Sequence, residues 1–209
     1  MNQLTLYTHP HSRGRNVRWM LEECGADYET VGVPFGEAMK SPEYRAINPL
    51  GKVPALRVGA TVITETAAII SYLADRFPER ALIPTPGSEA RGEYYRWLFF
   101  AVHLEYAAMD VWRGIKNNEE QKLAIGYGDF DEAVQLLRNH LHNRHYFLEE
   151  RFTALDLYYS GLLAWLMRTQ LLPNGAPFSD YMQRHLQRPA CQKAAALDEE
   201  LLKQLNAAN

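Results

Sequence analysis

Short and long hydrophobic patterns alternate in the first third of the chain. Four short stretches rich in apolar and β-branched residues predict strands: LTLYT (4–8), YETVGV (28–33), VPALRV (53–58) and TVIT (61–64). Two longer stretches have apolar residues at helical spacing, RGRNVRWMLEEC (13–24) and ETAAIISYLADRF (65–77). The order β-α-β, a loop region, then β-β-α predicts a small α/β domain with a mixed sheet over residues 1–77.

The pattern changes after residue 77. PERALIPTPGS (78–88) contains three prolines and a glycine, a composition typical of a linker. Beyond it the strand patterns vanish, and helical patterns cover about 89–115, 119–141, 153–171 and 190–206. Residues 89–209 are therefore expected to form a second, all-helical domain.

One helix in that region carries a complete start signal. In RFTALDLYYSG, Thr153 is placed to cap the helix and Asp156 to reach back to the Thr153 N–H, as in a capping box. The uniformly apolar run that follows predicts a buried central helix. Asp156 could alternatively be a catalytic carboxylate, but the pattern favours a structural role for both residues.

Composition excludes several functional classes. The net charge of −3, with acidic and basic residues interspersed, does not indicate a nucleic-acid partner. Cys24 and Cys191 lie far apart and form neither a disulfide framework nor a metal-ligand pattern, so no metal is expected. The chain shows no signal-peptide pattern and no apolar run of about 20 residues, so we expect a cytoplasmic protein that does not span a membrane.

Pro54 is an unusual residue at a strand start because it cannot donate a ladder hydrogen bond. The stretches NPLGKVPAL (48–56), TETAAIISYLADRFPE (64–79) and FTALDLYYSG (152–161) occur in an order that resembles the cytosolic glutathione transferases. This resemblance covers nearly the full chain. It implies a thioredoxin-like N-terminal domain with a four-stranded mixed sheet, an all-α C-terminal domain, and a homodimer.

The resemblance also implies a site for the tripeptide glutathione as co-substrate. It implies a cis Val53–Pro54 bond, with the Val53 backbone pairing with the cysteinyl backbone of glutathione. The helix start at Glu65 and Thr66 suits the γ-glutamyl carboxylate and ammonium. Lys52 is a candidate for the glycyl carboxylate or the peptide backbone, and is equally well read as a solvated loop lysine.

The chemistry of such a site requires the glutathione thiolate. Lowering a thiol pKa from ~8.5 to ~6.5 takes nearly 3 kcal/mol, which one hydroxyl at a helix start can supply. Ser12, at the first turn of the first predicted helix, is the favoured hydroxyl, and Tyr7 at the end of the first strand is the alternative. His11 is a further donor candidate beside the site.

The second substrate is expected to be a hydrophobic electrophile in a cleft between the domains. Candidates for its site are His103, Tyr106 and Met109, in an aromatic-rich helical segment. Two alternatives to conjugation stay open: glutathione-dependent reduction of peroxides or disulfides, and a non-catalytic regulatory protein of the same fold. A mechanism that uses a protein cysteine is disfavoured, because no cysteine stands in residues 9–15.

Overall fold

The structure, a computed structural model, describes residues 3–148 and 151–207. The chain divides into two compact units, Met1–Leu82 with Gln187–Asn209, and Ile83–Leu186. Each unit is described by itself below.

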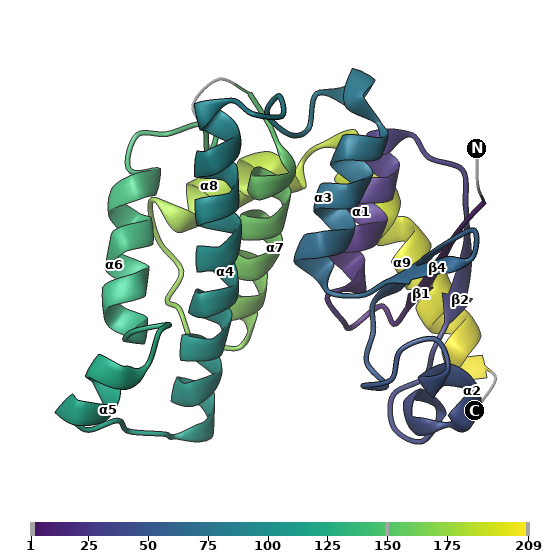
Figure 1. Ribbon diagram of the computed structural model, residues 1–209, viewed down its shortest axis with the longest axis horizontal. Helices are drawn as coiled ribbons and strands as arrows, with labels where there is room; N and C mark the ends of the chain where they lie inside the picture. Colours follow the sequence, from purple (N-terminus) through teal and green to yellow (C-terminus); the bar gives the residue numbers. More distant parts are fainter. Residues whose placement is uncertain (1–2, 149–150, 208–209) are drawn as a thin grey trace. The chain divides into compact units, whose positions relative to one another are not determined.

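The first unit contains a four-stranded sheet with the order β2-β1-β3-β4 (Figure 1). Its strands are β1 (Leu4–Thr8), β2 (Tyr28–Gly32), β3 (Ala55–Val58) and β4 (Thr61–Ile63). β1 is parallel to β2 and antiparallel to β3, and β4 is antiparallel to β3. This arrangement confirms the mixed sheet. The parallel strands β1 and β2 are joined through a helix, and the antiparallel strands β3 and β4 are joined by a hairpin.

Helices cover both faces of this sheet. α1 (Gly14–Cys24) and α3 (Thr66–Arg76) pack against each other, and the residues of this unit with 0% exposure include Leu6, Val17, Met20, Leu21, Ala55, Leu56, Ile69, Ile70, Leu73 and Ala74. The other face is covered by the 3-10 helix η1 (Ala38–Lys40) and by α2 (Pro42–Arg45). Tyr7 is buried there in a small cluster with Val33, Met39, Tyr44 and Ala55. A second 3-10 helix, η2 (Pro78–Arg80), follows α3.

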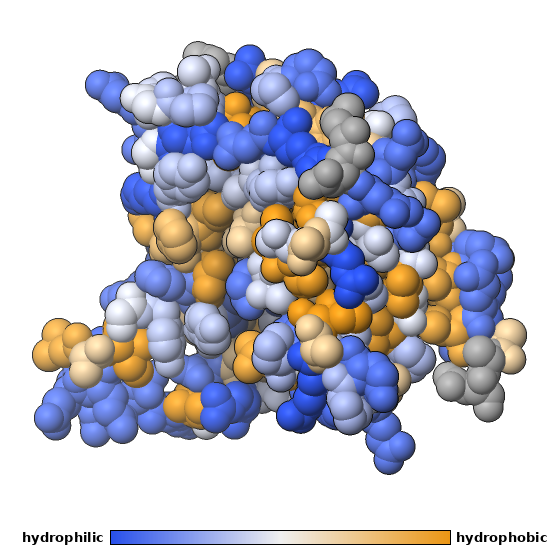
Figure 2. Space-filling view, turned by 45° about the vertical axis from the view of Figure 1, so that its right-hand side comes forward, coloured by the Kyte–Doolittle hydropathy of each residue, from blue (hydrophilic) through white to orange (hydrophobic). Residues whose placement is uncertain are grey.

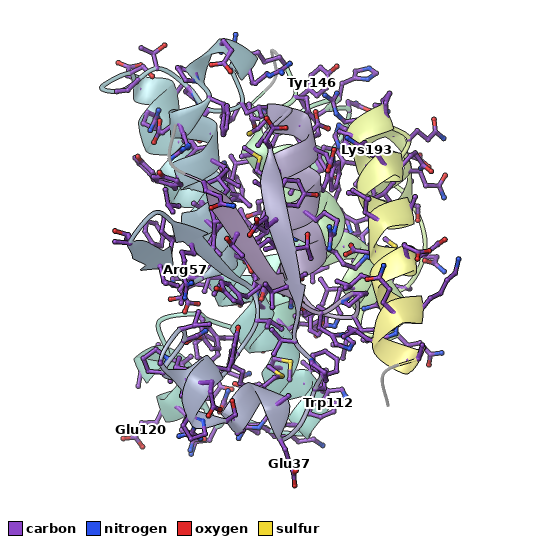
Figure 3. The ribbon with its side chains drawn as sticks, turned by 90° about the vertical axis from the view of Figure 1, so that its right-hand side faces the viewer. Glu37, Arg57, Trp112, Glu120, Tyr146 and Lys193 are labelled. Atoms are coloured by element: carbon purple, nitrogen blue, oxygen red, sulfur yellow. The ribbon has the colours of Figure 1, made fainter. Side chains whose placement is uncertain are left out.

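The C-terminal helix α9 (Pro189–Ala207) packs against α1 (Figure 3, yellow). Arg18 Nε lies 2.7 Å from Asp198 Oδ1, and both side chains are almost completely buried. Lys193, labelled in Figure 3, lies 2.7 Å from Glu22 on the exposed side of the same contact. Packing thus attaches residues 187–209 to the first unit, whereas the sequence pattern groups all of 89–209 together. The two groupings differ because long-range ion pairs, which helical periodicity does not reveal, hold α9 against α1. The domain limits 1–77, 78–88 and 89–209 stay a proposal.

The second unit is helical. It contains α4 (Glu89–Arg113), α5 (Glu119–Ala124), α6 (Phe130–Leu141), α7 (Ala154–Arg168) and α8 (Phe178–Leu186). α7 contacts both α4 and α8 and is buried over most of its length, as its apolar sequence predicts. The pattern over 119–141 forms two helices, because Gly126 and Gly128 interrupt it and Asp129 caps a new start. α8 was not identified from the sequence.

Three further findings concern the described residues. No helix among them has the length and apolar character needed to cross a membrane. Their histidine, cysteine, aspartate and glutamate side chains form no cluster of three that could hold a metal ion. Cys24 and Cys191 are both free thiols.

Candidate functional site

Three segments singled out from the sequence meet at one edge of the sheet. Tyr7, near the end of β1, pairs with Ala55 at the start of β3, so the loop after β1 begins beside Val53 and Pro54. β4 is antiparallel to β3 and therefore ends at the same edge, where α3 begins at Thr66. The topology alone brings the loop after β1, the residues before β3 and the start of α3 together.

The main chain of Val53 is a candidate contact for a ligand. The Val53–Pro54 peptide bond is cis, in agreement with the sequence-based expectation. Val53 precedes β3, and neither its N–H nor its C=O has a hydrogen-bond partner in residues 3–148 or 151–207. Its side chain is half-buried and packs against the cluster that contains Tyr7. Because buried main-chain groups are normally paired, an unpaired donor and acceptor beside a strand favour pairing with an extended peptide.

Lys52, the residue before Val53, is held in place through its main-chain carbonyl. The Tyr44 hydroxyl donates to the Lys52 C=O at 2.7 Å, and the Asn48 side-chain amide donates to the same oxygen at 2.8 Å. The Lys52 side chain is exposed. The structure therefore gives the Lys52 backbone a positioning role and leaves its ammonium at the surface, where a ligand carboxylate can reach it.

A second lysine anchors the same loop. Lys40 Nζ donates to the C=O of Leu50 at 2.8 Å and to the C=O of Gly51 at 2.9 Å. Gly51 has φ 57°, and a Cβ there would lie 2.3 Å from the Met39 carbonyl oxygen. Only glycine fits this position without strain. Sequence reasoning missed Lys40, Tyr44 and Asn48, because their role depends on contacts across the loop.

The start of α3 has an unusual backbone. Glu65 has φ 64° and ψ 117°, a region that residues other than glycine rarely occupy. Its side chain does not cap the helix, and the first turn carries no acidic residue. Glu65 is exposed and Thr66 is half-buried. Such backbone outliers cluster at ligand sites, and an uncapped helix start favours a negatively charged group.

The Ser12 hydroxyl already makes two hydrogen bonds within its own loop. Its hydroxyl donates to the His9 carbonyl oxygen at 2.7 Å and accepts from the Gly14 N–H at 3.0 Å. The side chain is half-buried in the turn that leads into α1. A hydroxyl has one hydrogen to donate, so Ser12 must turn it away from His9 before it can donate to a thiolate.

Tyr7 lies in a different environment. Its buried ring is 6.2 Å from the Tyr44 ring, and the Arg57 guanidinium lies 5.3 Å from its centroid. Val53 packs against the same cluster. Ser12 and Tyr7 therefore both lie near the site, Ser12 in the loop and Tyr7 beneath Val53.

The two histidines of the loop after β1 differ in their exposure to solvent. His11 is exposed, whereas His9 is buried and its ring stacks on Phe35 at 3.8 Å. The His11 N–H donates to His9 Nδ1 at 3.1 Å. Burial, with a smaller effect of His11, lowers the pKa of His9 below its usual value. The lowered pKa favours the neutral ring, and the His11 N–H that donates to Nδ1 favours the tautomer with its hydrogen on Nε2.

The acceptor candidates all lie on α4, in the second unit. His103 and Tyr106 are exposed and Met109 is half-buried, and the spacing of three residues places them along one side of the helix. Tyr106 lies 6.3 Å from the Tyr127 ring. On the face shown in Figure 2, hydrophobic side chains form patches within a mainly hydrophilic surface.

Asp156 is enclosed by donors. Its carboxylate accepts from the N–H and the hydroxyl of Thr153 at 2.7 and 3.0 Å, as part of a capping box. It also accepts from the Phe147 N–H at 2.7 Å and from the Tyr181 hydroxyl at 2.6 Å. Burial raises the pKa of Asp156, and these hydrogen bonds oppose the rise. A carboxyl group with 0% exposure is out of reach of a substrate, which favours the structural role.

Comparison with known proteins agrees with this geometry. Residues 2–75 match the family model described as glutathione S-transferase, N-terminal domain. The chain is 31% identical over 183 residues to glutathione S-transferase GstA of Escherichia coli O157:H7, which covers 85% of this chain and 90% of that protein. The chain belongs to the glutathione S-transferase family.

Solved structures show the same fold. A glutathione transferase from Methylococcus capsulatus str. Bath has a TM-score of 0.79 at 26% identity, covering 94% of this chain and 98% of that one. A glutathione transferase homologue from Sulfitobacter, solved with bound glutathione, has a TM-score of 0.72 at 27% identity and covers 97% and 100%. The N-terminal part therefore has the thioredoxin-like fold of these proteins. Another relative is elongation factor 1-gamma of Artemia salina, 30% identical over 159 residues, which cover 73% of this chain and 36% of that protein.

Proposed function

We propose that this protein binds glutathione and transfers its thiolate to a hydrophobic electrophile. The observation that carries the proposal is the unpaired N–H and C=O of Val53, next to an α3 start that no side chain caps. The glutathione bound in the Sulfitobacter homologue supports it. In this protein, Val53 would pair with the cysteinyl backbone in the manner of a short strand.

The remaining groups of glutathione have matching partners. The start of α3 would receive the γ-glutamyl carboxylate, with the Thr66 hydroxyl as a further donor, because N–H groups and the helix dipole favour an anion there. The exposed Glu65 carboxylate would take the γ-glutamyl ammonium. Lys52 would lie within reach of the glycyl carboxylate. Each charged group of glutathione would then meet a part of the protein that favours its charge.

Ser12 would stabilise the thiolate. A hydrogen bond to a charged acceptor is worth about 1.5–3 kcal/mol, so exchanging the His9 carbonyl for a thiolate as acceptor is favourable. The Gly14 N–H, which already donates to the Ser12 oxygen, polarises the hydroxyl and strengthens this donation. Tyr7 would stabilise the tripeptide site through its contact with the cluster beneath Val53, and remains the alternative thiolate donor.

Titration calorimetry with glutathione tests the binding step. Millimolar or tighter binding is expected, and Glu65→Ala should weaken it by about tenfold, the loss of one charged hydrogen-bonded contact. Glu79→Ala, which removes a carboxylate of η2, is the matched control and should bind normally. No detectable binding at millimolar glutathione would refute the proposal.

The ultraviolet absorbance of the bound thiolate as a function of pH tests the activating residue. Ser12→Ala should raise the pKa of bound glutathione by about one to two units, whereas Tyr7→Phe should leave it within about half a unit. The opposite result would assign the role to Tyr7. An unchanged pKa in both variants would exclude both hydroxyls.

Two other functions compete with conjugation. Reduction of hydroperoxides or disulfides uses the same thiolate, so rates with an aryl halide, a hydroperoxide and a model disulfide should be measured side by side. A non-catalytic role is the second alternative, and the likeness to elongation factor 1-gamma supports testing it. Binding of glutathione without turnover of any of the three substrates would favour that role.

The rest of the functional description is proposed on the same basis. His103→Ala, Tyr106→Ala and Met109→Ala should raise KM for an apolar electrophile and leave glutathione affinity unchanged. We also propose a homodimer, which sedimentation tests directly, and a cytoplasmic location.

A further inference from the structure

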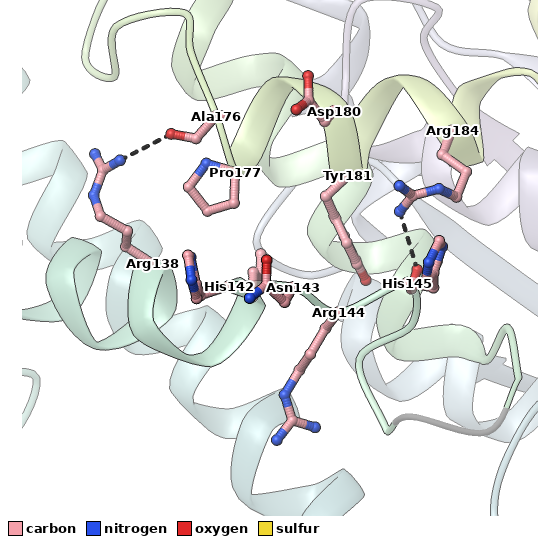
Figure 4. Close-up of a pocket in the computed structure, with 11 residues that line it drawn as sticks. Arg138, His142, Asn143, Arg144, His145, Ala176, Pro177, Asp180, Tyr181 and Arg184 are labelled. Carbon is pink, nitrogen blue, oxygen red and sulfur yellow. Dashed lines mark hydrogen bonds between the residues drawn. The ribbon is translucent and has the colours of Figure 1, made fainter.

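A cavity of about 630 Å³ lies within the helical unit (Figure 4). Its walls come from α6, the loop that follows α6, the residues before α8, and α8 itself. All of them belong to a single unit of the chain, Ile83–Leu186. The volume is in the range of about 300–1,000 Å³ typical of sites for small organic ligands.

The charge of the cavity differs from that of the chain. Among the residues that the structure describes, Arg138, Arg144 and Arg184 line it, with Asp180 as the only carboxylate. The lining thus has an excess of two positive charges, whereas the whole chain has a net charge of −3. A concave surface concentrates such a field, and it therefore favours an anionic ligand.

Two of these arginines are held in place and keep donors available. Arg138 Nη1 donates to the Ala176 carbonyl oxygen at 3.1 Å, and its guanidinium lies 4.8 Å from the centre of the Phe178 ring. Arg184 Nη1 makes a longer contact of 3.5 Å with the His145 carbonyl oxygen. In Figure 4 the two side chains enter the view from α6 and α8, on either side of Tyr181.

Neither of these guanidinium groups has a carboxylate partner in the part of the chain that the structure describes. Within the described ranges, no aspartate or glutamate lies within ion-pair distance of Arg138 or Arg184. Each guanidinium has five N–H donors, and only one is used in the contacts above. A guanidinium group that is held in place and has free donors is suited to a phosphate, because it can donate two parallel hydrogen bonds to two oxygens of the same phosphate.

We propose that this cavity is a binding site for a small organic phosphate. Arg138 and Arg184 bind the phosphate oxygens, and the space that remains accommodates an organic group. The half-buried Pro177, which supplies apolar surface to the wall, contacts that group. The proposal does not depend on glutathione binding, because no residue of the glutathione site lines this cavity.

Titration calorimetry with ADP as the probe tests this site. The wild-type protein should bind ADP with a dissociation constant below about 1 mM, and raising the salt concentration should weaken binding because the contact is electrostatic. Adenosine, which lacks the phosphates, should not bind. Absence of ADP binding, or equal binding of adenosine, would overturn the proposal. Inorganic pyrophosphate that binds as tightly as ADP would overturn the assignment of an organic ligand.

Matched variants localise the binding. Arg138→Gln with Arg184→Gln should weaken ADP binding at least about tenfold. Arg168→Gln, which removes one exposed positive charge from α7, should not change it. Circular dichroism and glutathione binding should match the wild type in all these proteins, which separates this test from the test of the proposed function. Unchanged ADP affinity in the double variant would refute the site.

A variant that is expected to bind ADP more tightly serves as a control for misfolding, because misfolding can only weaken binding. Asp180→Asn removes the one carboxylate among the described lining residues and should tighten ADP binding several-fold, because a repulsive charge is lost. Unfolding cannot produce tighter binding. Unchanged or weaker ADP binding in Asp180→Asn would contradict the electrostatic basis of the proposal.

Discussion

Replacing Asp156 by alanine removes the acceptor of four hydrogen bonds from a position with 0% exposure. The N–H groups of Phe147 and Thr153 and the hydroxyl of Tyr181 then have no acceptor, while the Thr153 hydroxyl can rotate to another partner. Each buried donor left unpaired costs about 1–3 kcal/mol. Relief of the desolvation of the Asp156 carboxylate offsets part of this cost. We expect a net loss of about 4 kcal/mol in the free energy of unfolding of the helical unit.

Urea denaturation followed by tryptophan fluorescence measures this loss, because Trp97, Trp112 and Trp165 all belong to the helical unit. A loss of 4 kcal/mol corresponds to a decrease in Tm of more than about 15 °C for a unit of this size. Tyr181→Phe removes one donor of the same network and should cost about 1 kcal/mol.

Asp131→Ala is the matched control. Asp131 is an exposed aspartate in the first turn of α6, and its loss should cost less than about 1 kcal/mol. A loss below about 1 kcal/mol for Asp156→Ala would refute the reasoning, since it would mean that the buried donors find other acceptors. A folded Asp156→Ala protein with a much lower turnover number would point instead to a catalytic role.

Three further predictions concern the first unit. Gly14→Ala should destabilise it by at least about 2 kcal/mol in urea denaturation, because the new Cβ would overlap the Thr8 side chain at the start of α1. Asp198→Ala should cost about 3 kcal/mol and expose α9 to limited proteolysis, because the Arg18 guanidinium loses its buried partner. Cys24 should resist alkylation in the native protein up to about pH 10, because burial raises its pKa to about 12. The unfolded thiol ionises at lower pH than the native one, so ionisation of Cys24 should also lower stability as the pH rises from 9 toward 12.

Each of these three has a result that would contradict it. Wild-type stability of Gly14→Ala would show that the turn before α1 can shift to make room. Unchanged proteolysis of Asp198→Ala would show that apolar contacts alone hold α9. Rapid alkylation of native Cys24 at pH 8 would mean that α1 opens readily to solvent.

Local sequence was sufficient for the features that depend on near neighbours. The strand pattern before Thr8, the helical spacing in α1 and α3, and the signal at Thr153 and Asp156 involve residues two to four positions apart. Backbone geometry makes such neighbours meet in any protein, so these elements were predicted. The cis bond before Pro54 was also expected, but on the basis of the family resemblance.

Other features of the candidate site and of the packing depend on contacts that no local pattern encodes. The hydrogen bond that occupies the Ser12 hydroxyl, the positive φ of Glu65 and the loop contacts of Lys40 were all unexpected. The Lys40 contacts join residues ten and eleven positions apart, and even the Ser12 bond, to a residue three positions away, depends on how the loop after β1 folds.

The sequence by itself determined the two kinds of structure in this protein, the α/β part and the helical part, because periodicity and capping act over single turns and strands. Only the tertiary structure placed α9 beside α1, where Asp198 meets Arg18 from 180 residues away. It alone also assembled the positively charged cavity from α6 and α8. Burial and charge pairing between distant residues depend on the complete packing of the chain, and the order of residues in one segment does not contain that information.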